Sequence, residues 1–242
     1  MHKTDAMQFH LGEIEVDVVK KDIKNIHLSV LPPAGKVRIA APLRMDVGTV
    51  RVFAITKLDW IKRQQKKLRE QARETPREYL DRESHYLWGR RYLLQLVEKD
   101  AAPCVELKHR KMILQLRSTK DQEKKMAVLD AWYRQQLKAH AQPLIGKWEA
   151  IIGVRAGRLF VQKMKTRWGS CNPGSGNIRL NTDLARKPLQ CLEYIIAHEL
   201  THLRERHHNA QFMALMDAHM PQWRQSREML NSLPLAHQEW EY

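Results

Sequence analysis

Apolar and polar residues alternate along the first forty positions, which is the period of a strand with one buried face. The alternating runs within residues 7–41 are FHLGEIEVDVV, IHLSVLP and KVRIAAP. Gly35 and several prolines separate these runs. Short strands divided by turn residues predict a small antiparallel meander.

The spacing changes to that of an amphipathic helix over residues 46–74. The apolar stripe consists of Val50, Phe53, Ala54, Leu58, Ile61 and Leu68, with Trp60 nearby. The opposite face carries Lys62, Arg63, Lys66, Lys67, Arg69 and Arg73. A solvated helix face accounts for this charge without any ligand, so the helix by itself predicts no binding site.

Alternation typical of strands returns between His85 and Arg117. Gly89 offers a hairpin within HYLWGRRYLLQLV, and residues 108–111 offer a polar turn within VELKHRKMILQL. The polar segment STKDQEKK then begins at residue 118. We therefore predict two domains: residues 1–117, a β-rich N-terminal subdomain with one basic helix, and residues 118–242, a C-terminal domain.

The second half opens with a helical pattern. Its apolar face consists of Met126, Leu129, Ala131, Trp132, Tyr133 and Leu137. Pro143 is expected to kink or restart this helix, and Gly153 is expected to end it. Two strands, RLFVQKMKTRWGSC and NIRLNTDL, follow and are joined by the turn residues NPGSG. These segregated strands and helices predict an α+β fold.

The composition adds a strong positive charge, because 42 Lys and Arg residues against 27 Asp and Glu residues give a net charge of +15. Such a field attracts polyanions, whether nucleotides, nucleic acid or an acidic protein, although a solvated surface accounts for any single cluster. The chain has no apolar run of about 18 residues, and its first ten residues lack the apolar core of a signal peptide. We therefore expect a cytoplasmic protein without a membrane partner.

The cysteines Cys104, Cys171 and Cys191 are widely spaced and form no C-x-x-C pair. This spacing argues against a disulfide framework and against a thiolate zinc site. Cys171 is expected to be a small buried residue rather than a metal ligand.

One stretch carries the spacing of a metal site. His198 and His202 are one helical turn apart, so on a helix both imidazoles leave the same face and suit one tetrahedral zinc ion. Glu199 follows the first histidine, where it can take a proton from a metal-bound water. The surrounding residues are apolar, so an ionised carboxylate there needs a compensating cation. The pattern predicts a metal-dependent hydrolase.

A catalytic zinc takes a third protein ligand and leaves one position for water. The nearby candidates are Glu205, His207, His208 and His219. Glu205 stays on the ligand face if the helix continues, whereas His208 reaches the metal only if the helix ends first. Asn209 is a good N-cap for a new helix, and this favours His208. The spacing from His202 to His208 also occurs in metzincins, but Glu205 replaces their turn glycine.

Three motifs in this order and spacing resemble the YgjP-like metallopeptidase family of small bacterial metal-dependent hydrolases. They are MKTRWGSC at residues 164–171, IRLN at 178–181 and HELTHLRERHHNAQF at 198–212. The N-terminal strands, Trp60-Ile61 and the WGRRY hairpin are also similar to that family. One departure is His207-His208, where the family usually carries Asn-His.

The resemblance implies a zincin-like C-terminal domain with the H-E-x-x-H helix beside a small sheet. It implies that His198, His202 and His208 bind metal and that Glu199 is the base. One divalent metal ion is expected, zinc as bound, with Mg, Mn or Co able to support activity. What is known of the family also implies metal-dependent pyrophosphatase activity on nucleoside triphosphates, notably UTP.

Three functions are compatible with these residues. In a phosphoanhydride hydrolase, Arg167, Lys165 and Arg179 would contact the phosphates of a small polyanion such as a nucleotide, because no glycine-rich phosphate loop is present. In a peptidase, the RWGSC or IRLN strand would offer an edge to an extended substrate. In a basic nucleic-acid-binding module, the metal would be structural, but Glu199 would then have no clear purpose. The charge favours a polyanionic substrate.

Overall fold

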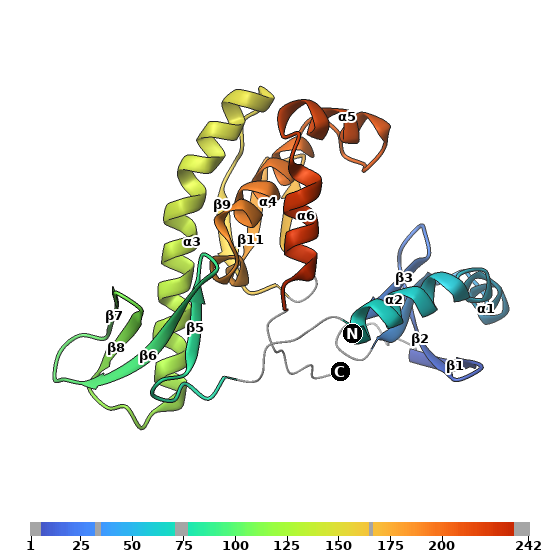
Figure 1. The fold of residues 1–242 in the computed structure, drawn as a ribbon. Helices are drawn as coiled ribbons and strands as arrows, with labels where there is room; N and C mark the ends of the chain where they lie inside the picture. Colours follow the sequence, from blue (N-terminus) through green and yellow to red (C-terminus); the bar gives the residue numbers. More distant parts are fainter. Residues whose placement is uncertain (1–5, 32–34, 71–76, 165–166, 235–242) are drawn as a thin grey trace. The chain divides into compact units, whose positions relative to one another are not determined.

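The computed structural model of the chain describes residues 6–31, 35–70, 77–164 and 167–234. The chain divides into two compact units, an N-terminal unit of Met1–Glu74 with Gln238–Tyr242 and a C-terminal unit of Thr75–His237. Strands and helices occur in both, which confirms the α+β class (Figure 1). Within the described ranges, no helix combines the length and apolar content needed to cross a membrane.

The N-terminal unit contains a four-stranded sheet in the order β1-β2-β4-β3. The strands are β1 (Ala6–Leu11), β2 (Ile14–Lys21), β3 (His27–Leu31) and β4 (Lys36–Pro42). β2 and β4 pair in parallel and the other pairs are antiparallel, so the predicted meander is wrong although its strands are present. Alternation specifies which face of a strand is buried, but not which strands pair. The fully buried Val16, Val18, Val37, Ile39 and Ala41 place β2 and β4 at the centre.

Two helices complete this core, α1 (Val47–Thr56) and α2 (Leu58–Glu70). Val50 and Ala54 of α1 and Ile61 of α2 are fully buried with the valines of the sheet, as the apolar stripe predicted. Gln65 of α2 donates a hydrogen bond to the carbonyl of Gly35 at 2.8 Å. The lysine and arginine residues of α2 whose side chains are described are exposed, on the outer side of the helix.

The C-terminal unit begins with a second four-stranded sheet, in the order β5-β6-β8-β7. Its strands are β5 (Ser84–Leu87), β6 (Arg90–Glu98), β7 (Cys104–Lys108) and β8 (Lys111–Leu116). Both predicted hairpins are present, β5 with β6 around Gly89 and β7 with β8. Leu94 and Leu114 of this sheet share a core with Leu129 of the following helix. This sheet therefore packs within the C-terminal compact unit. The domain boundary expected at 117/118 stays a prediction.

The longest element is α3 (Gln122–Ile152), which runs unbroken through Pro143. Asp121 caps its start by accepting a hydrogen bond from the Lys124 N–H at 2.9 Å. Gly153 ends it with a left-handed backbone, as predicted. The buried stripe of α3 is Leu129, Tyr133, Leu137, Ala141, Ile145, Trp148 and Ile152. Packing along this entire stripe outweighs the hydrogen bond that Pro143 removes, so the expected restart is wrong.

A small three-stranded sheet follows, with β9 (Leu159–Gln162), β10 (Gly169–Asn172) and β11 (Asn177–Asn181) in the order β10-β11-β9. The segment expected to form one strand, residues 158–171, thus forms two strands on opposite edges. β10 and β11 form the hairpin predicted around the NPGSG turn. Asn181 links the two parts, because its side-chain amide donates to the carbonyls of Met164 and Arg167.

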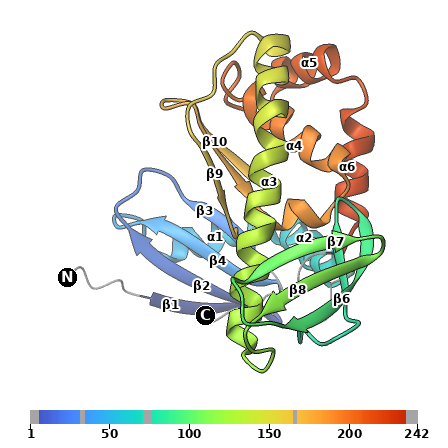
Figure 2. The same ribbon diagram turned by 90° about the vertical axis from the view of Figure 1, so that its left-hand side faces the viewer.

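A 3-10 turn (Thr182–Arg186) leads from this sheet into α4 (Leu189–Thr201), which is followed by α5 (Ala210–His219) and α6 (Trp223–Ser232). Helix α4 lies between the small sheet and α6, and α3 runs alongside it (Figures 1 and 2). The predicted H-E-x-x-H helix beside a small sheet is therefore present. This arrangement leaves α4 buried on several sides, and its C-terminal end carries the histidines.

Candidate metal centre

Helix α4 positions the first two histidines and the glutamate between them. Leu192, Ile196 and Leu200 are fully buried and hold the helix against the core. Thr201 ends the helix, and its hydroxyl donates to the carbonyl of Ala197 at 2.8 Å. His202 follows as the C-cap and keeps right-handed helical backbone angles. His198 and His202 therefore leave the same face of the helix end, as their spacing predicted.

A tight turn then returns the chain to this face. The N–H groups of Leu203 and Arg204 bond to carbonyls three residues earlier, which tightens the end of α4. The Arg204 guanidinium donates to the carbonyl of Ile152 at 3.0 Å and fixes the turn to the end of α3. Asn209 then starts α5 by accepting a hydrogen bond from the Phe212 N–H at 2.9 Å. The predicted helix break before Asn209 is confirmed.

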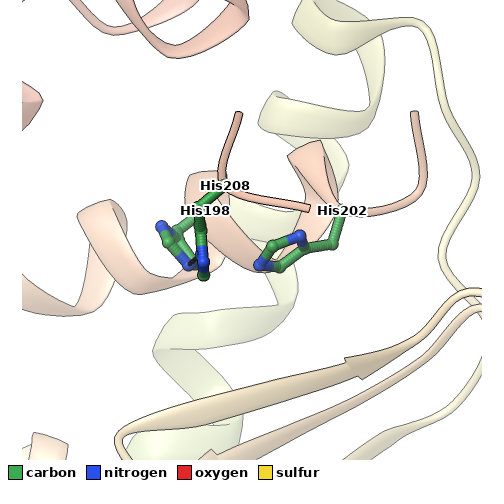
Figure 3. Close-up of side chains that lie close together, drawn as sticks. All are labelled: His198, His202 and His208. Carbon is green, nitrogen blue, oxygen red and sulfur yellow. Dashed lines mark hydrogen bonds between the residues drawn. The ribbon is translucent and has the colours of Figure 1, made fainter. Parts of the chain in front are cut away.

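The break brings His208 to the other two histidines (Figure 3). One ring nitrogen from each of His198, His202 and His208 lies within 4.8 Å of the other two. The Nε2 atoms of His198 and His208 are 2.9 Å apart. The Nδ1 atom of His202 lies 3.1 Å from the carbonyl oxygen of Glu205, which leaves its Nε2 atom free to bind. The three rings thus present nitrogen donors to a common point.

Phe212 lies against all three imidazoles. Its ring centroid is 5.0 Å from that of His198 and 4.8 Å from those of His202 and His208. Because Phe212 is 1% exposed and belongs to the core, it gives the histidines a rigid apolar floor.

The surroundings of the triad favour neutral imidazoles, although His198 and His202 are half-buried and His208 is exposed. Desolvation, followed by the charges of its neighbours, lowers the pKa of His198 to about 3. Desolvation is also the largest cause that lowers the pKa of His202 and of His208. Neutral imidazole is the form that binds metal, so the triad needs no deprotonation at neutral pH.

The donor set fits a divalent metal ion. Ligand atoms on a tetrahedral zinc ion lie about 3.4 Å apart, so small rotations of the side chains suffice to form three bonds. The Nε2 atoms of His198 and His208 lie at hydrogen-bonding distance, and a metal ion bound by both would replace that contact with two metal–nitrogen bonds. Three protein nitrogens would leave a fourth position for water.

Glu199 is buried beside the triad and is 6% exposed. The backbone N–H of Cys171 donates a hydrogen bond to its carboxylate. Desolvation raises the pKa of Glu199 to about 7, against the opposing effects of the Arg167 charge and this hydrogen bond. A carboxyl group with that pKa can both accept and return a proton near neutral pH.

Strand β10 presents its outer edge to Glu199. The Trp168 carbonyl accepts a hydrogen bond from the Asn181 N–H. In an antiparallel pair every second residue forms the backbone hydrogen bonds to its neighbour, so Ser170 and Asn172 form them with β11. The backbone groups of Gly169 and Cys171 therefore point outward, and the Cys171 N–H meets Glu199. In the described part of the chain no other strand pairs with this edge. The IRLN segment is the central strand β11, so it offers no free edge.

The basic residues predicted to contact substrate lie in different places. Arg167 is exposed next to β10, and its charge acts on Glu199. Arg179 pairs with Ser170, on the face opposite to the buried Ile178 and Leu180, and its guanidinium lies 5.4 Å from the ring centroid of Phe160. The structure thus brings Arg167, but not Arg179, toward Glu199. Lys165 lies outside the described residues.

The other ligand candidates are not part of the cluster. Glu205 contributes its carbonyl to His202, and its carboxylate accepts the His207 N–H at 3.0 Å. His207 is exposed, and His219 ends α5. Burial, followed by the charge of Glu199, raises the pKa of Cys171 to about 11, so its thiol stays protonated.

Sequence reasoning missed one group of residues on the α6 side. The ring of Tyr194, in α4, lies 5.8 Å from that of His198 and stacks on Trp223 of α6 at 6.4 Å. The Arg227 guanidinium lies 6.0 Å from the Trp223 ring centroid. Arg227 is nineteen positions beyond His208 and belongs to no metal motif, so only the amphipathic pattern of α6 could have indicated that it faces this way.

Three histidines able to hold a metal ion, set in this fold, define a metal-dependent hydrolase of the metallopeptidase type. The family described as YgjP-like, metallopeptidase domain, matches residues 24–233. The chain belongs to this YgjP-like family, which confirms the resemblance predicted from its motifs. Membership supports a bound metal ion, typically zinc.

Two solved structures are similar to part of the chain. The metallopeptidase zymogen abylysin of Pyrococcus abyssi is 19% identical over 40% of this chain and 99% of its own, with a TM-score of 0.36. The zymogen jannalysin of Methanocaldococcus jannaschii is 17% identical over 37% of this chain and 92% of its own, with a TM-score of 0.34. No curated protein matches the sequence.

Proposed function

We propose that the protein hydrolyses a phosphoanhydride bond of nucleoside triphosphates, of which UTP is the expected substrate, at a metal ion held by His198, His202 and His208. Glu199 is the general base. The observation that supports hydrolysis is the burial of Glu199 next to three converging imidazoles. A buried carboxylate has no purpose beside a purely structural metal, and this argues against a non-catalytic nucleic-acid-binding module.

A metal ion bound by the triad would polarise a phosphoryl oxygen and lower the pKa of a bound water. Glu199 follows His198 in sequence and is held in place by the Cys171 N–H. From this position its carboxylate can accept the proton of the attacking water and later protonate the leaving oxygen. The apolar side chains around α4 bury Glu199, and this low-polarity environment strengthens the electrostatic interactions of its carboxylate.

Arg167 supports a polyanionic substrate. It is exposed beside the base, its charge acts on Glu199, and within the described ranges it makes no ion pair. A guanidinium in this position can bind a phosphate with two parallel hydrogen bonds. The net charge of +15 attracts the same class of substrate.

The test is a screen of the purified protein with nucleoside triphosphates, with Mg, Mn, Co and Zn each added separately. Release of pyrophosphate from UTP is measured beside cleavage of casein. The Glu199→Gln variant is the control, because it should retain metal and lose about 100- to 10,000-fold in turnover. Pyrophosphate release without proteolysis supports the proposal. Proteolysis alone, or a Glu199→Gln variant as active as the parent, overturns it.

A second candidate, peptide hydrolysis, is supported by the free outer edge of β10. An extended peptide could pair with the outward carbonyl and N–H groups of Gly169, next to Glu199. The same triad and base would then act on a peptide carbonyl. Zinc-dependent cleavage of casein in the screen would favour this alternative.

A further inference from the structure

Helix α6 carries an arginine, Arg227, that is connected to His198 through aromatic side chains. Arg227 lies over Trp223, Trp223 stacks on Tyr194, and Tyr194 contacts the ring of His198. This continuous chain of ring contacts fixes the start of α6 against α4. The exposed guanidinium is thus linked through two buried aromatic rings to the first histidine of the triad.

A second arginine on the same helix shows what distinguishes Arg227. Arg224 lies 4.5 Å from the Trp223 ring centroid, but its guanidinium is paired with the carboxylate of Asp217. Arg227 makes no such ion pair with any described residue. One of the two cations over Trp223 is therefore neutralised, and the other is available to an external anion.

The two arginines without ion pairs among the described residues lie on different parts of the chain. The contacts of Arg227 lead through Trp223 and Tyr194 to His198. Arg167 is two positions before Gly169, where a Cβ atom would lie 2.8 Å from Oε1 of Glu199. Helix α4 lies between the small sheet and α6 (Figures 1 and 2), so the segment that leads into β10 and helix α6 pack against different sides of α4.

Phosphoryl transfer places the attacking and leaving oxygens roughly in line. Water activated by Glu199 attacks from the side of Arg167, so the leaving group departs on another side. When the attacked atom is the α-phosphorus, the new P–O bond forms to water and the bond to the β-phosphate oxygen breaks. The electron pair of that bond leaves with pyrophosphate, and Glu199 passes the proton from water to the leaving pyrophosphate oxygen.

We propose that Arg227 is the anion subsite for the pyrophosphate part of the substrate, whereas Arg167 binds the phosphate nearest the base. This division of roles rests on the proposed function and deepens it. It selects substrates with a polyphosphate leaving group over monoesters and diesters. Arg227 is then a substrate-binding residue that neutralises charge as it develops on the departing group.

The test measures binding of inorganic pyrophosphate and of UMP by isothermal titration calorimetry. The zinc-loaded parent, Arg227→Ala, Arg227→Lys and the matched control Arg224→Ala are compared, with metal content and thermal melting confirming that each is folded. The Arg227→Ala variant should bind pyrophosphate about 10- to 100-fold more weakly, with UMP affinity nearly unchanged. Arg227→Lys should recover part of the loss. Arg224→Ala should resemble the parent.

Equal weakening by Arg224→Ala and Arg227→Ala overturns the proposal, because a general field effect would then explain the loss. Equal loss of UMP and pyrophosphate affinity, or a parent that binds no pyrophosphate, also overturns it. Since binding needs no turnover, these results are separate from the substrate screen. If the screen fails while Arg227 still governs pyrophosphate binding, the anion subsite stands and the assigned reaction does not.

Discussion

The α-carbon of Gly169 lies directly against the carboxylate of Glu199. A Cβ atom at Gly169 would lie 2.8 Å from Oε1 of Glu199 and 2.8 Å from Cγ2 of Ile195. Neither side chain can easily move away from such a Cβ atom, because Ile195 is buried in α4 and Glu199 accepts a hydrogen bond from the Cys171 N–H. Only glycine allows β10 to approach the helix this closely.

The Gly169→Ala variant should therefore displace the proposed base. A shift of about 1 Å in a catalytic group costs about 100-fold in rate, and we expect a loss of that order. Metal content should be unchanged, because no histidine is involved. Gly146→Ala is the control, since a Cβ atom there meets nothing within 4 Å and α3 gains helix propensity. Full activity in Gly169→Ala would contradict the close contact.

The His208→Ala variant should lose metal affinity by more than about 100-fold, which is the usual upper limit for removing a residue that only supports a ligand. The neighbouring His207→Ala variant removes an exposed imidazole outside the cluster and should bind metal like the parent. Competition with a chromogenic chelator measures both affinities. Similar losses in the two variants would mean that His208 is not the third ligand.

The Asn209→Ala variant tests whether the start of α5 positions His208. Loss of an N-cap costs about 1 kcal/mol in the free energy of unfolding. We expect this loss together with weaker metal binding, because His208 directly precedes the cap. The control is Asp121→Ala, which removes the N-cap of α3 far along the chain from the histidines. Chemical denaturation should show similar destabilisation in both variants, with metal affinity lowered in Asn209→Ala alone.

A buried histidine outside the metal centre should make the C-terminal unit sensitive to acid. His85 of β5 is 0% exposed, and desolvation, followed by the charges of Arg77 and Arg186, lowers its pKa to about 3. Below about pH 6.5 the unfolded chain binds a proton that the folded chain does not. The contribution of the neutral His85 ring to the free energy of unfolding is therefore fully present above pH 6.5, and it declines as the pH falls toward 3.

The expected slope is at most about 1.4 kcal/mol per pH unit in the free energy of unfolding, the value for one proton. The His85→Gln variant cannot take up this proton, so its stability should fall less steeply between pH 6.5 and pH 3. Denaturant titrations at several pH values give the slopes. His109→Asn changes an exposed turn residue and should keep the slope of the parent. An unchanged slope in His85→Gln would exclude His85 as the source.

The features that the sequence predicted correctly depend on residues close together in the chain. The break between α4 and α5 follows from Asn209, and the pairing of His198 with His202 follows from helical periodicity. Missed features depend on contacts between distant segments. The contact of Gly169 with α4, the position of Arg227 and the parallel pairing of β2 with β4 have no local signal. The predicted restart of the helix at Pro143 failed for the same reason, because packing along α3 outweighs a local preference.

Phe212 has a consequence for the affinity of the centre. Fixing a mobile side chain during binding costs about 0.5–1.5 kcal/mol of conformational entropy. Because one buried ring contacts all three imidazoles, folding has already restricted their rotamers. The histidine side chains therefore lose less conformational entropy when a metal ion binds. The strength of binding therefore depends partly on a hydrocarbon side chain that cannot itself bind metal.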